Sequence, residues 1–164
     1  MIWLSVLLLQ AAAAAGPTPQ IDHGQTLFFG ENGCGTCHVL KGRGTAVGPD
    51  LRVLGRVGVR ALVTAIKATR TEYVQTIKLK GSEPFPGMKV SEDATEAQYY
   101  DLSKMPPELR KFAPADIESK TDNTTWKHPP SQSGLTNEQL ADIVAYIRWA
   151  ATGEKKHIDA DDVE

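Results

Sequence analysis

Cysteine is scarce in this chain, which has only Cys34 and Cys37 among its 164 residues. A wider disulfide framework is therefore excluded, because neither thiol has a further cysteine with which to pair. Histidine is scarce as well, with four residues in the sequence. Since a zinc site needs about four ligands, the two cysteines would have to recruit distant histidines, and a zinc site is disfavoured.

The chain also lacks a strong excess of either charge. Its formal net charge is −2, and it has no basic patch with interleaved aromatic residues, so nucleic acid is not expected as a partner. Hydrophobic residues make up 41% of the sequence, which is ordinary for a globular chain. Behind the apolar N-terminus, roughly 145 residues are enough for one domain with a hydrophobic core.

The apolar N-terminus, residues 1–15, contains neither lysine nor arginine. It is shorter than the ~20 residues that a membrane-spanning helix requires. An alanine run before Gly16 offers small residues to a signal peptidase, so we expect a cleaved signal peptide, or an N-terminal anchor if the segment is retained. Residues 16–20, with two prolines, are predicted to form a linker. The protein is therefore expected to be periplasmic or otherwise extracytoplasmic, and membrane-associated if the leader stays.

Both cysteines belong to the segment Cys34-Gly35-Thr36-Cys37-His38. Two cysteines that are separated by two residues and followed by histidine are the attachment signature of a c-type haem. Each thiol can add across one vinyl group of the porphyrin, while the histidine can turn its imidazole under the iron. The alternative is a redox dithiol of the thioredoxin kind, which expects a βαβ context. Residues 21–33 instead predict a short helix followed by a glycine-rich turn.

The surroundings of this motif extend the pattern. A predicted helix ending in Phe28-Phe29, then the segment 34–38, then Gly48-Pro49-Asp50-Leu51, together resemble the class I cytochrome c family. The resemblance implies one haem c, bound covalently through Cys34 and Cys37.

The same resemblance implies roles for three further residues. His38 becomes the proximal iron ligand, and the backbone carbonyl of Pro49 becomes the acceptor of its imidazole N–H, which fixes the tautomer. The segment 135–147 is similar to the C-terminal helix of the family, whose aromatic face crosses the first helix near the haem edge. Tyr146 is then expected in the core or at the haem edge, with Phe28 as its partner.

The C-terminal helix is the best-specified element of the sequence. Thr136 and Gln139 form a capping box, and Gly153 is a suitable C-terminal stop. Between them the apolar residues follow one helical stripe. The acidic tail, residues 154–164, is predicted to be solvated and mobile.

The middle of the chain departs from the compact family core. Residues 57–69 predict a helix by the spacing of their apolar side chains. The segment 73–79 is rich in β-branched and aromatic residues and predicts a strand, and short strands are expected within residues 89–102. This pattern resembles a subgroup of cytochromes c that inserts a small β-meander before the distal-ligand loop. We predict a mainly α fold, with the cytochrome c domain over residues 21–153 and the insertion at about 72–124.

Three residues are candidates for the sixth iron ligand. Met105 precedes a proline pair and matches the usual methionine loop, and Met88 follows Pro-Gly. In the family that loop lies shortly before the C-terminal helix, where His128 stands with the same two following prolines. The proline pair would rigidify the loop and hold the preceding side chain toward the iron. We therefore predict His128 as the distal ligand, ahead of Met105 and then Met88.

The predicted function is one-electron transfer by a monohaem c-type cytochrome, whose iron cycles between the ferric and ferrous states. Expected partners are redox proteins, including a membrane respiratory or photosynthetic complex, and the chain itself is not expected to be an enzyme. The alternative is a haem enzyme or a haem subunit of a larger oxidoreductase, such as a peroxidase or dehydrogenase module. A gas-binding module is a third interpretation, and six-coordinate iron would separate the carrier from both. The sequence names neither the electron donor and acceptor nor the reduction potential and oligomeric state.

Overall fold

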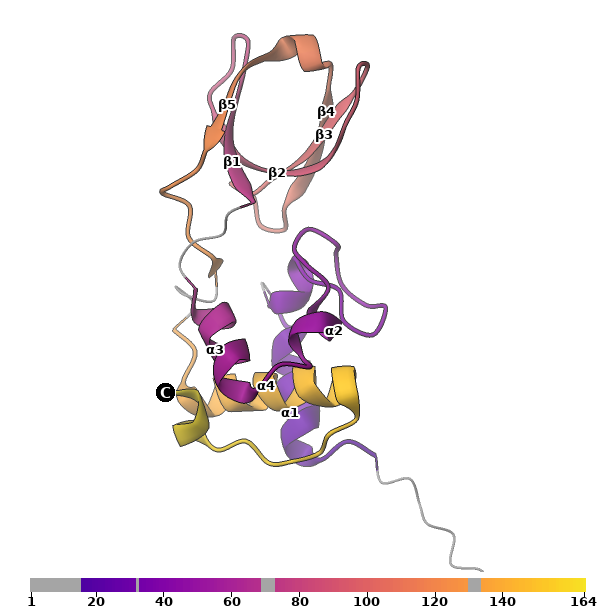
Figure 1. The fold of residues 1–164 in the computed structure, drawn as a ribbon, viewed down its shortest axis with the longest axis vertical. Helices are drawn as coiled ribbons and strands as arrows, with labels where there is room; N and C mark the ends of the chain where they lie inside the picture. Colours follow the sequence, from indigo (N-terminus) through magenta and orange to yellow (C-terminus); the bar gives the residue numbers. More distant parts are fainter. Residues whose placement is uncertain (1–15, 32, 69–72, 130–133) are drawn as a thin grey trace, which may run out of the picture.

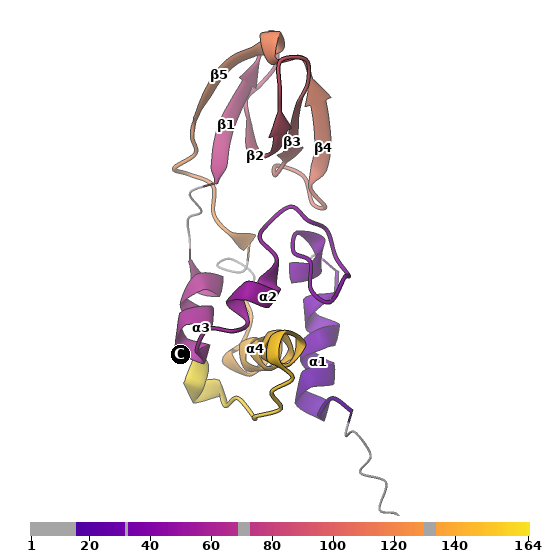
Figure 2. The same cartoon turned by 45° about the vertical axis from the view of Figure 1, so that its right-hand side comes forward.

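Helices and sheet form two separate parts of the molecule (Figure 1). The computed structural model describes residues 16–31, 33–68, 73–129 and 134–164. Within these residues the helical part has one hydrophobic core and the sheet has another. The sheet stands beyond one end of the helical part, as Figure 2 also shows from a second direction.

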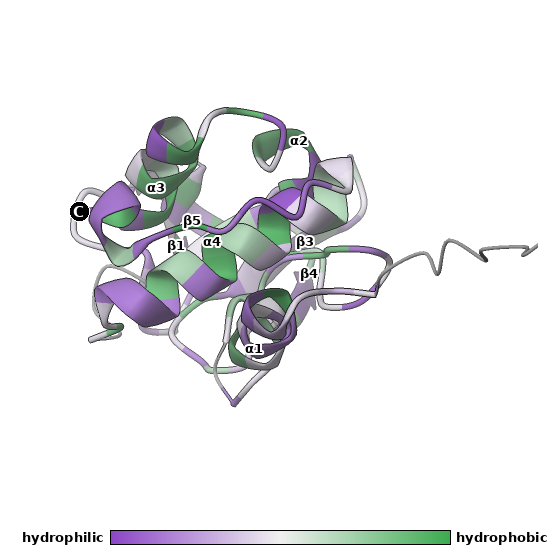
Figure 3. Ribbon diagram, turned by 90° about the horizontal axis from the view of Figure 1, so that it is seen from below, coloured by the Kyte–Doolittle hydropathy of each residue, from purple (hydrophilic) through white to green (hydrophobic). Residues whose placement is uncertain are grey.

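The helical part is built around the crossing of its first and last helices. In the described part of the chain the α-helices are α1 (Pro19–Phe28), α2 (Leu51–Leu54), α3 (Val59–Lys67) and α4 (Asn137–Thr152). Figure 3 shows α4 lying between α1 and α3. Helix α1 approaches α4 closely because residue 24 is glycine: a Cβ at Gly24 would lie 1.9 Å from the carbonyl oxygen of Asp142. Near this crossing Phe28 and Tyr146 are buried, with ring centroids 5.6 Å apart.

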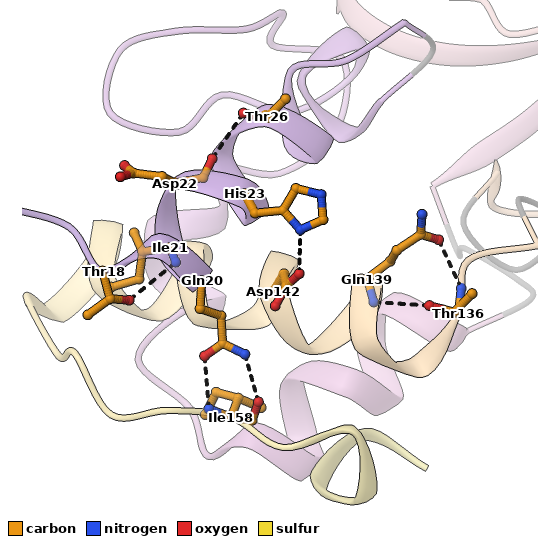
Figure 4. Close-up of polar contacts among 10 residues, drawn as sticks. All are labelled: Thr18, Gln20, Ile21, Asp22, His23, Thr26, Thr136, Gln139, Asp142 and Ile158. Carbon is orange, nitrogen blue, oxygen red and sulfur yellow. Dashed lines mark hydrogen bonds and ion pairs between the residues drawn. The ribbon is translucent and has the colours of Figure 1, made fainter.

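The capping box predicted for the C-terminal helix is confirmed. Thr136 Oγ1 accepts the N–H of Gln139 at 3.2 Å, and the Gln139 side chain accepts the N–H of Thr136 at 3.0 Å (Figure 4). Gly153 ends the helix with a φ of 77°, a left-handed conformation that glycine adopts without a steric penalty. None of the helices in the described ranges is long and apolar enough to cross a membrane.

The sheet has five antiparallel strands in the order β4-β3-β2-β1-β5. They are β1 (Val74–Leu79), β2 (Phe85–Glu92), β3 (Ala97–Asp101), β4 (Glu108–Phe112) and β5 (Ile117–Asp122). The sheet curls on itself (Figure 1), and its register shifts at Lys78/Leu79 and Lys89/Ser91 mark irregularities that bend a sheet. Its concave core contains Ile77, Phe85 and Tyr99, all buried.

The prediction of a mainly α fold is wrong, because a five-stranded sheet with its own core accompanies the helices. The strands that the sequence pattern missed are the two edge strands, β4 and β5. Both are charged and largely exposed along their length. An edge strand with one exposed face does not need the apolar alternation by which strands are recognised, and charges there protect the edge from pairing with other chains.

The acidic tail is packed against the helices, so the prediction that it is mobile is wrong. Ile158 and Val163 are only 2% and 0% exposed. The Gln20 side chain donates to the Ile158 carbonyl at 2.8 Å and accepts the Ile158 N–H at 3.1 Å (Figure 4). Lys67, the last residue of α3, donates to the Val163 carbonyl at 2.5 Å. Two buried apolar side chains and three hydrogen bonds to the backbone thus hold the tail against the helices.

Replacing Ile158 by alanine tests this packing. Ile158→Ala should lower the free energy of unfolding by about 2–5 kcal/mol, because it removes a fully buried side chain and leaves a cavity. Urea denaturation measures the change. His157→Ala is the matched control, since the His157 side chain is 69% exposed and should be nearly neutral. Equal midpoints for the two variants would show that the tail is not docked in solution.

Candidate functional site

The two cysteines lie in a tight turn directly after α1. Residues Cys34–Thr36 form the 3-10 helix η1, and the N–H groups of Cys37 and His38 both donate to the Cys34 carbonyl, at 3.1 and 2.9 Å. Gly35 packs against the ring of Phe29, where a Cβ would lie 2.5 Å from the nearest ring carbon. The turn is therefore held by backbone hydrogen bonds and by the aromatic end of α1.

Burial raises the pKa values of the two thiols, which is unfavourable for a redox dithiol. Both cysteines are free, and burial raises the pKa of Cys34 to about 11 and also raises the pKa of Cys37. Reactive Cys-X-X-Cys pairs depend on a lowered thiol pKa, which makes the nucleophilic thiolate available. The described structure also places a helix rather than a strand before the motif. These observations argue against the thioredoxin-like alternative.

His38 is oriented by the loop that follows it. Its Nδ1 lies 2.8 Å from the carbonyl oxygen of Pro49, the contact that the resemblance implies. A carbonyl can only accept, so Nδ1 carries the proton and donates it to Pro49. The other ring nitrogen, Nε2, then keeps its lone pair for a metal. The assignment of His38 as the proximal ligand stays a prediction, and its tautomer suits that role.

Gly48 makes room for this ring. A Cβ at position 48 would lie 2.4 Å from Cε1 of His38, a distance that no side chain can tolerate. The N–H groups of Val47 and Gly48 donate to the Cys37 carbonyl, at 3.1 and 2.7 Å. The loop is thus tied to the attachment turn, and its glycine lets the backbone pass close to the imidazole.

His128 lies beside His38, although the two residues are far apart in the sequence. Their ring centroids are 6.0 Å apart and the ring planes are inclined by 84°. Nδ1 of His128 lies 3.2 Å from the carbonyl oxygen of Ile66, to which it donates. Ile66 belongs to the last turn of α3, where carbonyls lack an intrahelical partner. The helix end therefore supplies His128 with an acceptor, as Pro49 does for His38.

The centroid spacing agrees with the value for two imidazoles that bind one metal ion in line. If both Nε2 atoms face the ion, two metal–nitrogen bonds of about 2.0 Å, with each ring centroid about 1.1 Å beyond its bonding nitrogen, place the centroids about 6 Å apart. Burial lowers the pKa of both imidazoles, which favours the unprotonated form that can bind a metal. No group of three or more His, Cys, Asp or Glu side chains that could hold a metal ion occurs in the ranges that the structure describes.

The other two candidate ligands belong to the sheet and its turns. Met105 is in the turn between β3 and β4 and is 45% exposed, and Met88 is a half-buried residue of β2 that pairs with Val74 and Tyr100. The ring of His128 lies beside that of His38, which supports His128 as a candidate. The distal-ligand assignment itself remains a prediction.

Tyr146 packs near the attachment turn through the ring of Phe29. Its ring centroid lies 6.1 Å from that of Phe29, whose other contacts include Gly35. Cations cover the same aromatic cluster: the Arg43 guanidinium lies 4.1 Å from the Phe29 centroid, and the Lys41 ammonium lies 3.9 Å from that of Trp149. Tyr146 therefore contributes to the core beside the turn through Phe29.

Sequence reasoning missed the Ile66 carbonyl. A backbone acceptor carries no residue signature, so only the end of a helix could have indicated it. The predicted helix over 57–69 ends near this position, but nothing in the sequence connects its last turn with His128.

A family model described as Cytochrome c matches residues 21–151, which include most of α1, the whole sheet and most of α4. No curated protein sequence matches the chain.

Substituting Gly48 tests the packing of the proximal imidazole. Gly48→Ala should displace the His38 ring and lower the free energy of unfolding by about 1–3 kcal/mol, because the added methyl group overpacks the loop. Urea denaturation and the absorption spectrum of the purified protein report the two effects. Gly58→Ala is the control: a Cβ there meets nothing within 4 Å, so it should leave the spectrum unchanged and cost only the small loss from replacing the N-cap glycine of α3. Identical results for both variants would contradict the close contact at Gly48.

Proposed function

The chain belongs to the cytochrome c family, and from that premise we propose that it is a monohaem electron carrier with two histidine ligands. The family binds haem c and transfers electrons. The observation that carries the finer proposal is the 6.0 Å separation of the His38 and His128 rings next to the Cys34–Cys37 turn. One attachment motif in the sequence supports one covalently bound haem.

Two pairs of residues would bind the haem. Cys34 and Cys37 would form the thioether bonds, and His38 and His128 would hold the iron. The bound haem supplies the one-electron couple of its iron. The carbonyls of Pro49 and Ile66 hold the Nδ1 protons, which orients both rings and increases their basicity as ligands. Two imidazoles lack the methionine sulfur that raises the potential, so a comparatively low potential is expected.

The finer family assignment is a subgroup of cytochromes c with a β insertion before the distal ligand. What supports it is the position of the sheet: β1 to β5 fall between α3 and α4, and His128 comes after β5. The carrier is expected to exchange electrons with redox proteins, either as an independent protein or as a haem subunit of a larger complex in a membrane.

The proposed location is outside the cytoplasm. It is supported by the apolar residues 1–15 and by the attachment motif, because covalent haem attachment of this type is expected there.

Intact-mass spectrometry of the protein, purified from its natural source and then denatured, tests haem attachment and export together. The mass should exceed that of the polypeptide by one haem, and the N-terminus should lie near Gly16. The double variant Cys34→Ala, Cys37→Ala should have no added mass, because it lacks both thiols. Haem that leaves the wild-type protein in acidified organic solvent would refute covalent attachment, and an intact Met1 in the membrane fraction would establish an anchor instead.

The distal ligand is tested by spectroscopy of two single variants. The ferric protein should show a low-spin bis-histidine spectrum without the far-red methionine-to-iron band. His128→Ala should open the sixth position to added ligands, whereas Met105→Ala should leave it closed. A methionine band that disappears in Met105→Ala would overturn the assignment of His128.

A further inference from the structure

Asn123 joins the base of the sheet to the segment that carries His128. It follows β5 directly, and its backbone N–H donates to the Val74 carbonyl, at the start of β1, at 3.0 Å. Its side-chain oxygen Oδ1 accepts three hydrogen bonds: from Thr125 N at 3.0 Å, from Thr125 Oγ1 at 3.2 Å and from Trp126 N at 2.6 Å. One residue therefore extends the pairing of β1 with β5 and turns the chain that leaves the sheet.

The turn continues directly into the distal site. The ring of Trp126 lies 6.3 Å from the ring of His128, centroid to centroid. His128 in turn contacts the Ile66 carbonyl and lies beside the His38 ring. A continuous series of contacts thus runs from the sheet through Asn123 and Trp126 to the candidate ligand.

We propose that Asn123 is a positioning residue for the distal iron ligand. The inference rests on the proposed function, in which His128 is that ligand. An asparagine turn of this kind fixes the backbone of the residues that follow it, so the segment is ordered before the imidazole binds. Without the turn, ligation by His128 has to offset the conformational entropy of ordering residues 123–128. The sheet then serves as the support on which the distal side of the site is built.

A second turn in the same sheet separates this role from simple stabilisation. Asp93 Oδ1 accepts hydrogen bonds from Thr95 N at 2.7 Å, from Thr95 Oγ1 at 2.8 Å and from Glu96 N at 2.9 Å. The pattern is the same as at Asn123. This turn lies in the β2–β3 hairpin, at the end of the sheet away from the helices (Figures 1 and 2). Asp93→Ala therefore removes an equivalent turn without touching the path to His128.

Titration of the ferric holoprotein with imidazole provides the test, because added imidazole binds where the distal ligand is released. Asn123→Ala should raise the apparent association constant for imidazole by about tenfold, since three hydrogen bonds that order the ligand segment are lost. Asn123→Asp keeps the Oδ1 acceptor and should stay close to wild type. Asn123→Ser keeps a weaker acceptor and should be intermediate. Asp93→Ala should match wild type.

The outcomes separate this proposal from the one on which it rests. If His128→Ala opens the iron but Asn123→Ala and Asp93→Ala bind imidazole equally, the positioning role is overturned and the ligand assignment stands. If His128→Ala binds imidazole no better than wild type, the ligand assignment fails, and the role of Asn123 fails with it. Should Asn123→Ala yield no folded holoprotein, the Asp and Ser variants decide: equal imidazole affinities for the two overturn the proposal.

Discussion

Two hydrogen bonds from imidazole rings to backbone carbonyls fix the candidate site. Pro49 accepts the Nδ1 proton of His38 at 2.8 Å, and Ile66 accepts that of His128 at 3.2 Å. Each acceptor is supplied by local chain geometry: Pro49 by a loop that passes the ring at Gly48, and Ile66 by the end of α3. Because Nδ1 carries the proton in both rings, Nε2 is in each ring the nitrogen with the lone pair. The orientation of the two imidazole rings thus depends on backbone carbonyl groups as well as on the histidine side chains themselves.

The helical part and the sheet position the two histidines in different ways. The proximal side belongs to the helical core, where α1, its aromatic end and the attachment turn form one packed unit with α4. The His128 side of the candidate site lies where the chain returns from the sheet to the helices, at Asn123 and Trp126. The sheet has its own core, and among the described residues none of its strands contributes an apolar side chain to the helical core, so it can hold that return segment in place independently.

The sequence predicted what strong local patterns encode. The capping box of α4 and its stop at Gly153 are confirmed, and they follow from side chains that act on their own helix ends. It could not show that charged segments become edge strands, or that Ile158 and Val163 fix the tail, because both depend on partners distant in sequence. For the site, the attachment motif indicated His38, and the proline pair before the C-terminal helix indicated His128. The backbone acceptor Ile66 and the turn at Asn123 became visible only in three dimensions.

The sheet begins and ends at neighbouring points, since the Asn123 N–H donates to the Val74 carbonyl at 3.0 Å. A segment whose ends meet can be inserted between two neighbouring points of a fold. The entropic cost of closing such a loop increases only slowly with the length of the segment. Replacing such a unit leaves the separation of its flanking segments unchanged, provided that the turn at Asn123 is kept. The same property makes this sheet a suitable place to graft another small domain next to the candidate site.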